Sequence, residues 1–292
     1  MADPDRLAPL LERLRISTSL FFTGAMCGRE HFAAHPGRGF LHVLRRGELT
    51  MEYLAPDGSA RSLSVDRPSV VFVPRPWEHT FVNAPVGGSD FTCAALDVSG
   101  GATHPLFAAL PHVVVIPLDD IAELEPALQL LFGEADQVRC GRTIIADRLF
   151  EVVLIQLLRW MLDHADALQI SAGLVTGLGD PRLAPLLTEL HAEPGRAWTI
   201  EQMARTAMMS RSVFMARFTS VMGIAPAEYL TRWRLTLAQG RLLAGESVTR
   251  VAAELGYASA SSFTRAFTQH LGASPRHWAQ ARDGAGGPAP RG

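Results

Sequence analysis

Two apolar stripes near the C-terminal end constrain this chain most: they lie in SVTRVAAELGYASASSFTRAFTQHLGASPRHW, residues 247–278. The first stripe recurs at i, i+3, i+4 and i+7: Val248, Val251, Ala252 and Leu255. This spacing predicts a short helix with one buried face. Gly256 then interrupts the pattern, and glycine accepts the positive φ of a tight turn.

A second helix is predicted directly after this turn, with Ser259 as its cap. Phe263 and Phe267 form its inward face. The outward face carries polar residues at the same helical spacing: Ser261, Thr264, Arg265 and Thr268. Two short helices joined by a glycine turn are typical of a helix-turn-helix. An arginine among small hydroxyl side chains suits a DNA major groove, where a guanidinium can read guanine.

The same unit occurs earlier in the chain, so the pattern is duplicated. Its buried stripe lies 48 residues upstream (Ile200, Met203, Ala204 and Ala207), and its outward stripe is Ser212, Met215, Ala216 and Thr219. Phe214 and Phe218 repeat the phenylalanine pair 49 residues upstream, and the first turn is one residue shorter. Thr199 and Gln202 predict a capping box.

One continuous helix over Pro226–Leu243 is predicted between the units, with proline in its first turn. Eighteen residues at about 1.5 Å each give roughly 27 Å. Successive major-groove faces of B-DNA lie roughly 34 Å apart, so two units on this spacer could read adjacent turns. The alternative is a helical bundle in which the stripes only pack, but matched outward stripes in a duplicated pair favour DNA binding.

Residues 180–282 resemble the DNA-binding domain of the AraC/XylS family of bacterial transcription regulators. The segments MARTAMMSRSVFMARF, GIAPAEYLTRWRL and VAAELGYASASSFTRAFTQHLGASPRHW carry the resemblance. It implies DNA contacts from Ser210, Arg211, Ser212, Met215, Ala216, Arg217, Ala260, Ser261, Thr264, Arg265 and Thr268. We expect Arg265 to dominate base readout, and Arg211, Arg217, Arg232 and Arg234 to touch phosphates.

Three positions depart from the family pattern. Met208 stands where the family usually has a turn glycine, while Ala216 and Ala260 stand where longer polar side chains are common. The first unit is therefore expected to rely on shape and methyl contacts more than on hydrogen bonds.

Charge is distributed unevenly between the two parts of the chain. Residues 180–282 contain twelve arginines and seven acidic residues, whereas residues 1–179 contain fourteen arginines and twenty-one acidic residues. A polyanion would therefore bind the C-terminal part. No secretory signal is predicted, because residues 1–17 are charged and contain proline instead of forming an apolar core. No membrane span is predicted, because the longest apolar run, 152–162, is too short to cross a bilayer. We expect a cytoplasmic protein.

The predicted organisation is an α+β chain in six parts. They are an N-terminal helix (1–20), a cupin-like β-barrel sensor domain (21–117), a helical dimerisation segment (118–170), a linker (171–179), an all-α double helix-turn-helix domain (180–282) and a disordered tail (283–292). Short apolar runs predict barrel strands at 41–45, 49–54, 61–65, 70–74 and 91–96. The long helix of the dimerisation segment is predicted to turn Ile144, Ile145, Leu149, Val152, Val153 and Gln156 inward.

The barrel region resembles a cupin in FLHVLRRGELTMEYL and VDRPSVVFVPRPWEHTFVN. Pro74, His79 and Asn83 match the second cupin motif. Only His35 matches the first, since Ala33 and Phe40 replace the partner histidine and glutamate. A catalytic cupin metal needs three ligands or more. We therefore predict no cofactor, no bound metal and no enzyme activity; His35 and His79 are the candidates for any metal, with His31 and His42 nearby.

Three cysteines, Cys27, Cys93 and Cys140, occur without a CxxC pair, which favours neither a disulfide framework nor zinc. A free cysteine is commonly a small buried apolar residue. The arrangement of CGREH and FTC around the cupin core is similar to the reactive-chlorine-responsive branch of the family. That resemblance implies oxidant sensing by Cys27 and Cys93, with Arg29 and His31 close enough in sequence to favour the Cys27 thiolate.

The sequence therefore predicts a transcription regulator that binds promoter DNA. We expect an activator and a homodimer, with an oxidant or small molecule as effector and RNA polymerase as a possible further partner. Two alternatives stay open: a regulator that binds a small molecule and has inert cysteines, and a metal-dependent cupin enzyme with an accessory DNA-binding domain.

Overall fold

The computed structural model describes residues 5–13, 16–98, 104–108, 110–170 and 172–283. The chain divides into two compact units. The barrel unit comprises residues 16–102 and 106–170; the helical unit comprises residues 1–15, 103–105 and 171–292. The predicted tail lies outside the described residues from 284 onward.

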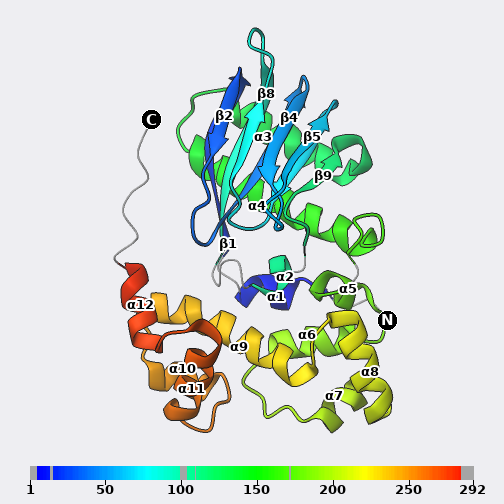
Figure 1. The fold of residues 1–292 in the computed structure, drawn as a ribbon, viewed down its shortest axis with the longest axis vertical. Coiled ribbons are helices and arrows are strands. Elements are labelled where there is room, and N and C mark those ends of the chain that lie inside the picture. The colour runs from blue at the N-terminus through cyan, green and yellow to red at the C-terminus, as the bar shows by residue number, and fades with distance from the viewer. Residues whose placement is uncertain (1–4, 14–15, 99–103, 109, 171, 284–292) are drawn as a thin grey trace. The chain divides into compact units, whose positions relative to one another are not determined.

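The barrel unit consists of two antiparallel sheets (Figure 1). Its strands are β1 (Ile16–Met26), β2 (Arg29–Phe32), β3 (Arg38–Arg46), β4 (Leu49–Leu54), β5 (Ala60–Val65), β6 (Ser69–Val73), β7 (His79–Val82), β8 (Ser89–Val98) and β9 (Val114–Pro117). The strand orders are β1-β8-β3-β6-β9 and β2-β7-β4-β5. The five strands predicted from apolar runs are confirmed, with their ends placed to within three residues. The prediction of a helix through residue 20 is wrong, because β1 begins at Ile16.

Burial on both faces explains why β6 has no polar alternation. All five of its residues, SVVFV, are buried, as expected for a strand covered on both sides. Between the sheets, Phe40, Leu44, Phe81 and Phe91 belong to one apolar core with Cys93. The predicted cupin-like fold is thus built around an aromatic interior.

Helices α3 (Glu125–Ala135) and α4 (Arg142–Asp163) complete the barrel unit, with the short segments α2 (Pro105–Ala108), η2 (Leu118–Asp120) and η3 (Ala122–Leu124). The buried residues of α4 are Ala146, Phe150, Val153, Leu154, Leu157, Leu158 and Met161. Of the predicted inward residues only Val153 is among them. Ile144 is 70% exposed and Val152 is 42% exposed, so the predicted inward face is wrong.

Asp147 provides the physical reason for this rotation of α4. Its Oδ1 accepts a hydrogen bond from the Leu20 backbone N at 2.7 Å, and its carbonyl accepts one from Thr18 Oγ1 at 2.5 Å. Both donors lie on β1. Because α4 has apolar residues around most of its circumference, periodicity alone could not decide which side faces the sheet.

The helical unit contains α1 and α5 to α12. Their bounds are α1 (Ala8–Arg13), α5 (Leu174–Gly179), α6 (Ala184–Ala192), α7 (Ile200–Thr206), α8 (Arg211–Met222), α9 (Pro226–Leu243), α10 (Val248–Glu254), α11 (Ala260–Leu271) and α12 (Pro275–Asp283). Figure 1 shows α9 as the long helix between the pair α7–α8 and the pair α10–α11. The predicted connecting helix has the observed bounds.

Two elements outside the predicted DNA-binding domain belong to the helical unit. Helix α1 packs on α6, burying Leu7 and Leu10, and Arg6 Nη1 donates to the Leu178 carbonyl at 2.9 Å. The predicted linker over 171–179 is wrong, because α5 occupies it. Gly177 explains the error: a Cβ there would lie 2.3 Å from the Met222 sulfur, so this glycine permits close helix packing.

A buried polar contact lies inside the helical unit. His191 Nε2 and Tyr229 Oη are 2.6 Å apart, and the His191 ring lies edge-on to Trp233 at 4.9 Å. His104, also fully buried, is 6.4 Å from the Trp233 ring. Burial lowers the pKa of His191 and of His104 to about 3. Both imidazoles are therefore neutral in the fold at neutral pH.

Candidate nucleic-acid interface

Helices α10 and α11 form the second helix-turn-helix motif. Ser247 Oγ accepts from the Arg250 backbone N, and Ser259 forms a capping box with Ser262. Gly256 has φ +77° in the turn, and a Cβ there would meet the Gly195 carbonyl oxygen at 2.3 Å. The predicted cap and turn are thus confirmed, and the turn position excludes a side chain.

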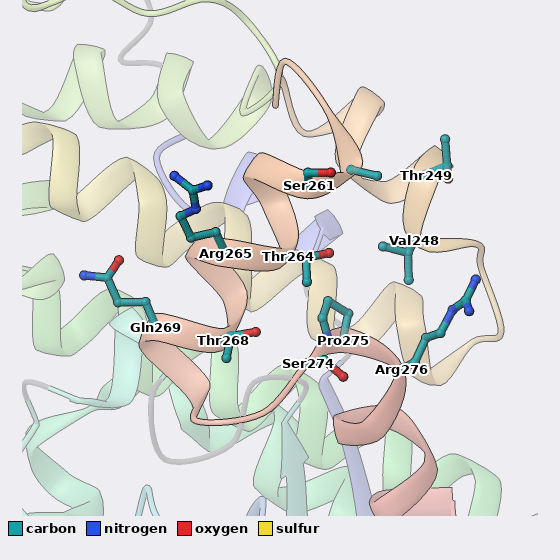
Figure 2. A pocket seen from close by; sticks show the side chains of 11 residues that line it. Val248, Thr249, Ser261, Thr264, Arg265, Thr268, Gln269, Ser274, Pro275 and Arg276 are labelled. Atoms are coloured by element: carbon teal, nitrogen blue, oxygen red, sulfur yellow. The ribbon is translucent and has the colours of Figure 1, made fainter.

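A groove of about 690 Å³ follows the outward side of α11. Its lining residues are Val248, Thr249, Ala260, Ser261, Thr264, Arg265, Thr268, Gln269, Ser274, Pro275 and Arg276. Figure 2 shows Thr264 and Thr268 between the two arginines, Arg265 on one side and Arg276 on the other. Among the residues that the structure describes, neither arginine has a recorded ion pair or hydrogen-bond partner, so both guanidinium groups remain available to a ligand.

Helices α7 and α8 form the first motif, with the predicted capping box between Thr199 and Gln202. Met208 lies in the turn at φ +53°, the left-handed region that favours glycine. Ser210 precedes α8 as its cap residue, although its side chain makes no capping hydrogen bond. The backbone thus keeps the turn geometry that the family pattern assigns to glycine.

The predicted base-contact residues reach the surface in both motifs. Ser212, Ala216 and Thr219 are exposed and Met215 is partly buried; Ser261, Arg265 and Thr268 are exposed, and Ala260 and Thr264 are partly buried. Phe214, Phe218, Phe263 and Phe267 are fully buried. The outward and inward faces are therefore as the sequence predicts, and the outward stripes are not packed inside a bundle.

The other predicted arginines have protein partners. Arg211 pairs with Glu201 at 3.2 Å, and Arg217 pairs with Asp180 at 2.6 Å. Arg232 pairs with Glu228 at 2.6 Å. Arg234 is half-buried and donates to the carbonyls of residues 194 and 196 at 2.7 and 2.9 Å. The guanidinium of Arg234 thus holds the loop before α7, and a phosphate contact from this residue stays a prediction.

The sequence prediction missed six groove residues: Val248, Thr249, Gln269, Ser274, Pro275 and Arg276. Arg276 follows Pro275, the first residue of α12. The 49-residue offset between the motifs pairs Gly272 with Gly223 and Pro275 with Pro226. Because the same offset continues through these residues, it could have predicted that the outward surface of the second motif extends into α12.

Cys27 and Cys93 differ in environment. Cys27 is exposed, whereas Cys93 is fully buried and burial raises the pKa of its thiol well above the usual value. Cys93 is paired with Phe22, while Cys27 follows Met26, which is paired with Ser89. Four residues of β8 separate these levels, about 13 Å at 3.3 Å per residue. A disulfide needs Cα atoms within about 7 Å, so the pair is not bridged in this arrangement of strands.

The side chains of Arg29 and His31 contact groups other than Cys27. Arg29 donates to both carboxylate oxygens of Glu52, with the Nη2–Oε2 distance 2.6 Å. His31 Nδ1 lies 3.3 Å from Thr80 Oγ1. These contacts do not support the expectation that Arg29 and His31 stabilise the Cys27 thiolate.

The two candidate metal residues, His35 and His79, differ in burial. His35 is exposed, whereas His79 is buried and its Nε2 lies 3.2 Å from Nε2 of His42. Burial lowers the pKa of His79 to about 4 and that of His42 well below its usual value. In the described part of the chain, no three histidine, cysteine, aspartate or glutamate side chains are grouped to hold a metal ion.

Comparison with known proteins gives two family matches. A cupin family model matches residues 5–163, and a helix-turn-helix family model matches residues 203–281. A putative AraC-like transcription regulator of Streptomyces lividans is 37% identical over 177 residues, which is 60% of this chain and 58% of that protein. The chain belongs to the AraC family. This chain combines a cupin domain with a helix-turn-helix domain, and its relatives are named as transcription regulators.

Two further relatives extend the comparison. The RCS-specific transcriptional activator RclR of Escherichia coli is 26% identical over 245 residues, covering 82% of this chain and 85% of that protein. The DNA-binding domain of AdpA, solved with a target DNA, is 32% identical and covers 37% of this chain and 96% of that chain, with a TM-score of 0.35. The chain spans 58% of the length of the Streptomyces lividans relative and 61% of the length of a second putative AraC-like transcription regulator, from Streptomyces antibioticus.

A search for membrane-spanning helices gave none. Across the described residues of this AraC-type chain, every helix is too short or too polar to cross a lipid bilayer.

Proposed function

We propose that this AraC-type chain is a sequence-specific regulator that binds promoter DNA through both helix-turn-helix motifs. One observation carries the proposal: Arg265 stands on the outward face of α11, exposed and without a recorded ion pair among the described residues, beside the hydroxyls of Ser261 and Thr264. An arginine so placed can donate two hydrogen bonds to guanine O6 and N7.

Two properties of the helical unit support DNA as the partner. The excess of arginine over acidic residues in 180–282 favours a polyanion. Helix α9 has 18 residues, roughly 27 Å of rigid spacer, which suits two readers on adjacent major-groove faces of one duplex. A bacterial promoter is reached in the cytoplasm, which is where we expect the protein to act.

Arg265→Ala tests the proposal by gel shift on a duplex selected from random DNA. We expect a loss of about 1–3 kcal/mol in binding free energy on that duplex and relaxed preference at one base pair. The matched control is Arg67→Ala, an exposed arginine of the barrel unit outside α4, which should leave binding unchanged. Equal weakening by Arg265→Ala on all sequences would contradict base readout by this residue.

We further propose that the chain acts as a homodimeric activator, with RNA polymerase as a partner at the promoter. The support for a dimer is an exposed stripe on α4: Ile144, Ile145, Arg148, Val152, Ile155 and Arg159. Residues 145, 152 and 159 follow a seven-residue spacing, as do 148 and 155. This spacing is typical of a helix that pairs with a second helix along one seam.

The second candidate function concerns the signal, and two observations favour an oxidant: the likeness to RclR and the exposed thiol of Cys27. We propose that hypochlorous acid converts the Cys27 thiolate to a sulfenic acid with release of chloride. Condensation with the Cys93 thiol would then release water and form a disulfide. Because the register holds the two apart, this second step requires β1 to shift against β8.

Cysteine variants test this candidate. Cys27→Ser should abolish the oxidant response of DNA binding, whereas Cys140→Ser, at a second exposed cysteine, should preserve it. Free thiols counted by mass before and after oxidant should fall by two in the parent chain and in Cys140→Ser. An unchanged response in Cys27→Ser would remove the thiol switch. Thermal-shift screening with aromatic acids and sugars would then identify a small-molecule effector.

A further inference from the structure

The two helix-turn-helix motifs carry different chemistry at matching positions. With the buried phenylalanine pairs aligned at an offset of 49, Arg265 on α11 corresponds to Ala216 on α8. Arg276 on α12 corresponds to Ala227 on α9. Both alanines are exposed, so both cations of the second groove are replaced by methyl groups at the surface of the first motif.

The middle of the outward surface is also less polar in the first motif than in the second. Thr264, which faces the groove in Figure 2, corresponds to the partly buried Met215. Ser212 and Thr219 keep the hydroxyls of Ser261 and Thr268. The first motif therefore presents two methyl groups and a thioether side chain between two small polar side chains.

The cation left on this surface is neutralised. Arg211 corresponds to Ala260 in the second groove, and its guanidinium pairs with Glu201 at 3.2 Å. Glu201 itself corresponds, at the 48-residue offset of the first helices, to the groove residue Thr249. The Glu201 carboxylate offsets the charge of this arginine and contacts one of its guanidinium nitrogens, which lowers its value as a base reader.

We propose that the first motif reads thymine methyl groups through Met215, Ala216 and Ala227, while the second motif reads guanine through Arg265. In the major groove only thymine presents a C5 methyl, and apolar side chains recognise it. The operator would then have two unlike half-sites about one helical turn apart, one rich in A·T pairs and one with a required guanine. This inference rests on the proposed DNA-binding function.

Selection from a random duplex library with the full chain is the first experiment. We expect one half-site in which thymines are enriched without a required guanine, and a second half-site with an invariant guanine. If no sequence is enriched, the proposed function itself fails. If both half-sites require guanine, DNA binding stands and the thymine readout is overturned.

Base analogues in the selected duplex then test the chemistry. Replacing thymine by deoxyuridine in the first half-site removes only the methyl group, and should weaken binding about fourfold per contacted base. The same replacement in the second half-site should have no effect. Replacing guanine by 7-deazaguanine in the second half-site should weaken binding about tenfold. Unchanged affinity after uridine replacement in the first half-site would overturn the proposal.

Ala216→Arg provides a gain-of-function test. This variant copies the second motif at an exposed position, so repeated selection should now enrich guanine in the first half-site and the uridine effect there should shrink. Arg265→Ala is the reciprocal control and should remove the guanine requirement from the second half-site alone. Selection of the same thymine-rich half-site by Ala216→Arg would mean that Ala216 does not face the bases.

Discussion

At the scale of single residues, the turns of the two helix-turn-helix motifs use different residues at a position with positive φ. Gly256 and Met208 both have positive φ, +77° and +53°. Gly256 must be glycine because the Gly195 carbonyl occupies the space of a Cβ. Met208 is 79% exposed, so its side chain fits, and the cost is only the left-handed backbone, about 1–2 kcal/mol for an L-residue.

Met208→Gly should therefore stabilise the helical unit. Relief of the left-handed conformation outweighs the extra backbone entropy of glycine, for a net gain of about 0.5–1 kcal/mol in the free energy of unfolding. Urea denaturation would measure the gain. Met209→Gly is the control in the same turn: Met209 lacks positive φ, so that variant should lose stability. A loss in Met208→Gly would contradict the argument.

At the scale of elements, α1 and α4 depart most from a simple reading of the chain. Helix α1 is the first helix in sequence but packs on α6 in the helical unit. Helix α4 buries one apolar face and exposes another. In both cases the periodicity identifies a helix, and the partner of each face depends on contacts far away in the sequence.

Leu10→Ala tests the role of α1. Leu10 is fully buried, so truncation should cost about 2–5 kcal/mol and should act on the helical unit. Limited proteolysis at rising temperature, read by mass spectrometry, should show that the region 172–283 is cleaved at a lower temperature in this variant than in the parent chain. Leu11→Ala, at a partly exposed neighbour, should have a smaller effect. Equal loss from both variants would mean that α1 contributes no specific packing.

Charge on the exposed stripe of α4 tests the proposed dimer. Val152→Glu places a carboxylate at the centre of the seam, where burial against a second copy is costly without a partner. Light scattering after gel filtration should show a monomer at concentrations where the parent chain is a dimer. Val86→Glu alters a valine that is 88% exposed outside α4 and should leave the dimer intact. A dimeric Val152→Glu chain would exclude this seam.

At the scale of the whole molecule, buried histidines link folding to pH. His42 and His79 in the barrel unit and His104 and His191 in the helical unit all have lowered pKa values, chiefly because burial disfavours the imidazolium. In the unfolded chain they titrate near 6.5. Their contribution to stability is therefore complete above that pH and is lost as pH falls toward 4 and 3.

Denaturation with urea between pH 7.5 and 4.5 should show this loss. Each buried histidine contributes a slope of up to about 1.4 kcal/mol per pH unit below 6.5. His79→Gln should reduce this slope by the contribution of one histidine, up to about 1.4 kcal/mol per pH unit. Ser64→Gln, at an exposed residue without a titratable side chain, should leave it unchanged. A pH-independent free energy of unfolding across this range would contradict the neutral buried imidazoles.

The sequence by itself determined the duplicated motifs, because each depends on contacts between residues a few positions apart. The caps at Thr199 and Ser259, the turn glycine and the 18 residues of α9 all follow from local backbone chemistry. The outward position of Arg265 follows from the same periodicity, as does the cupin-like succession of short strands.

Only the tertiary structure decided which apolar face of α4 is buried, that α1 joins α6, and that 174–179 is a helix and not a linker. It also placed Cys27, directly after β1, at a different level from Cys93 on β8. The physical reason is common to these cases: each depends on partners distant in the sequence, such as Asp147 with β1 or Gly177 with Met222. A local pattern contains no information on such partners.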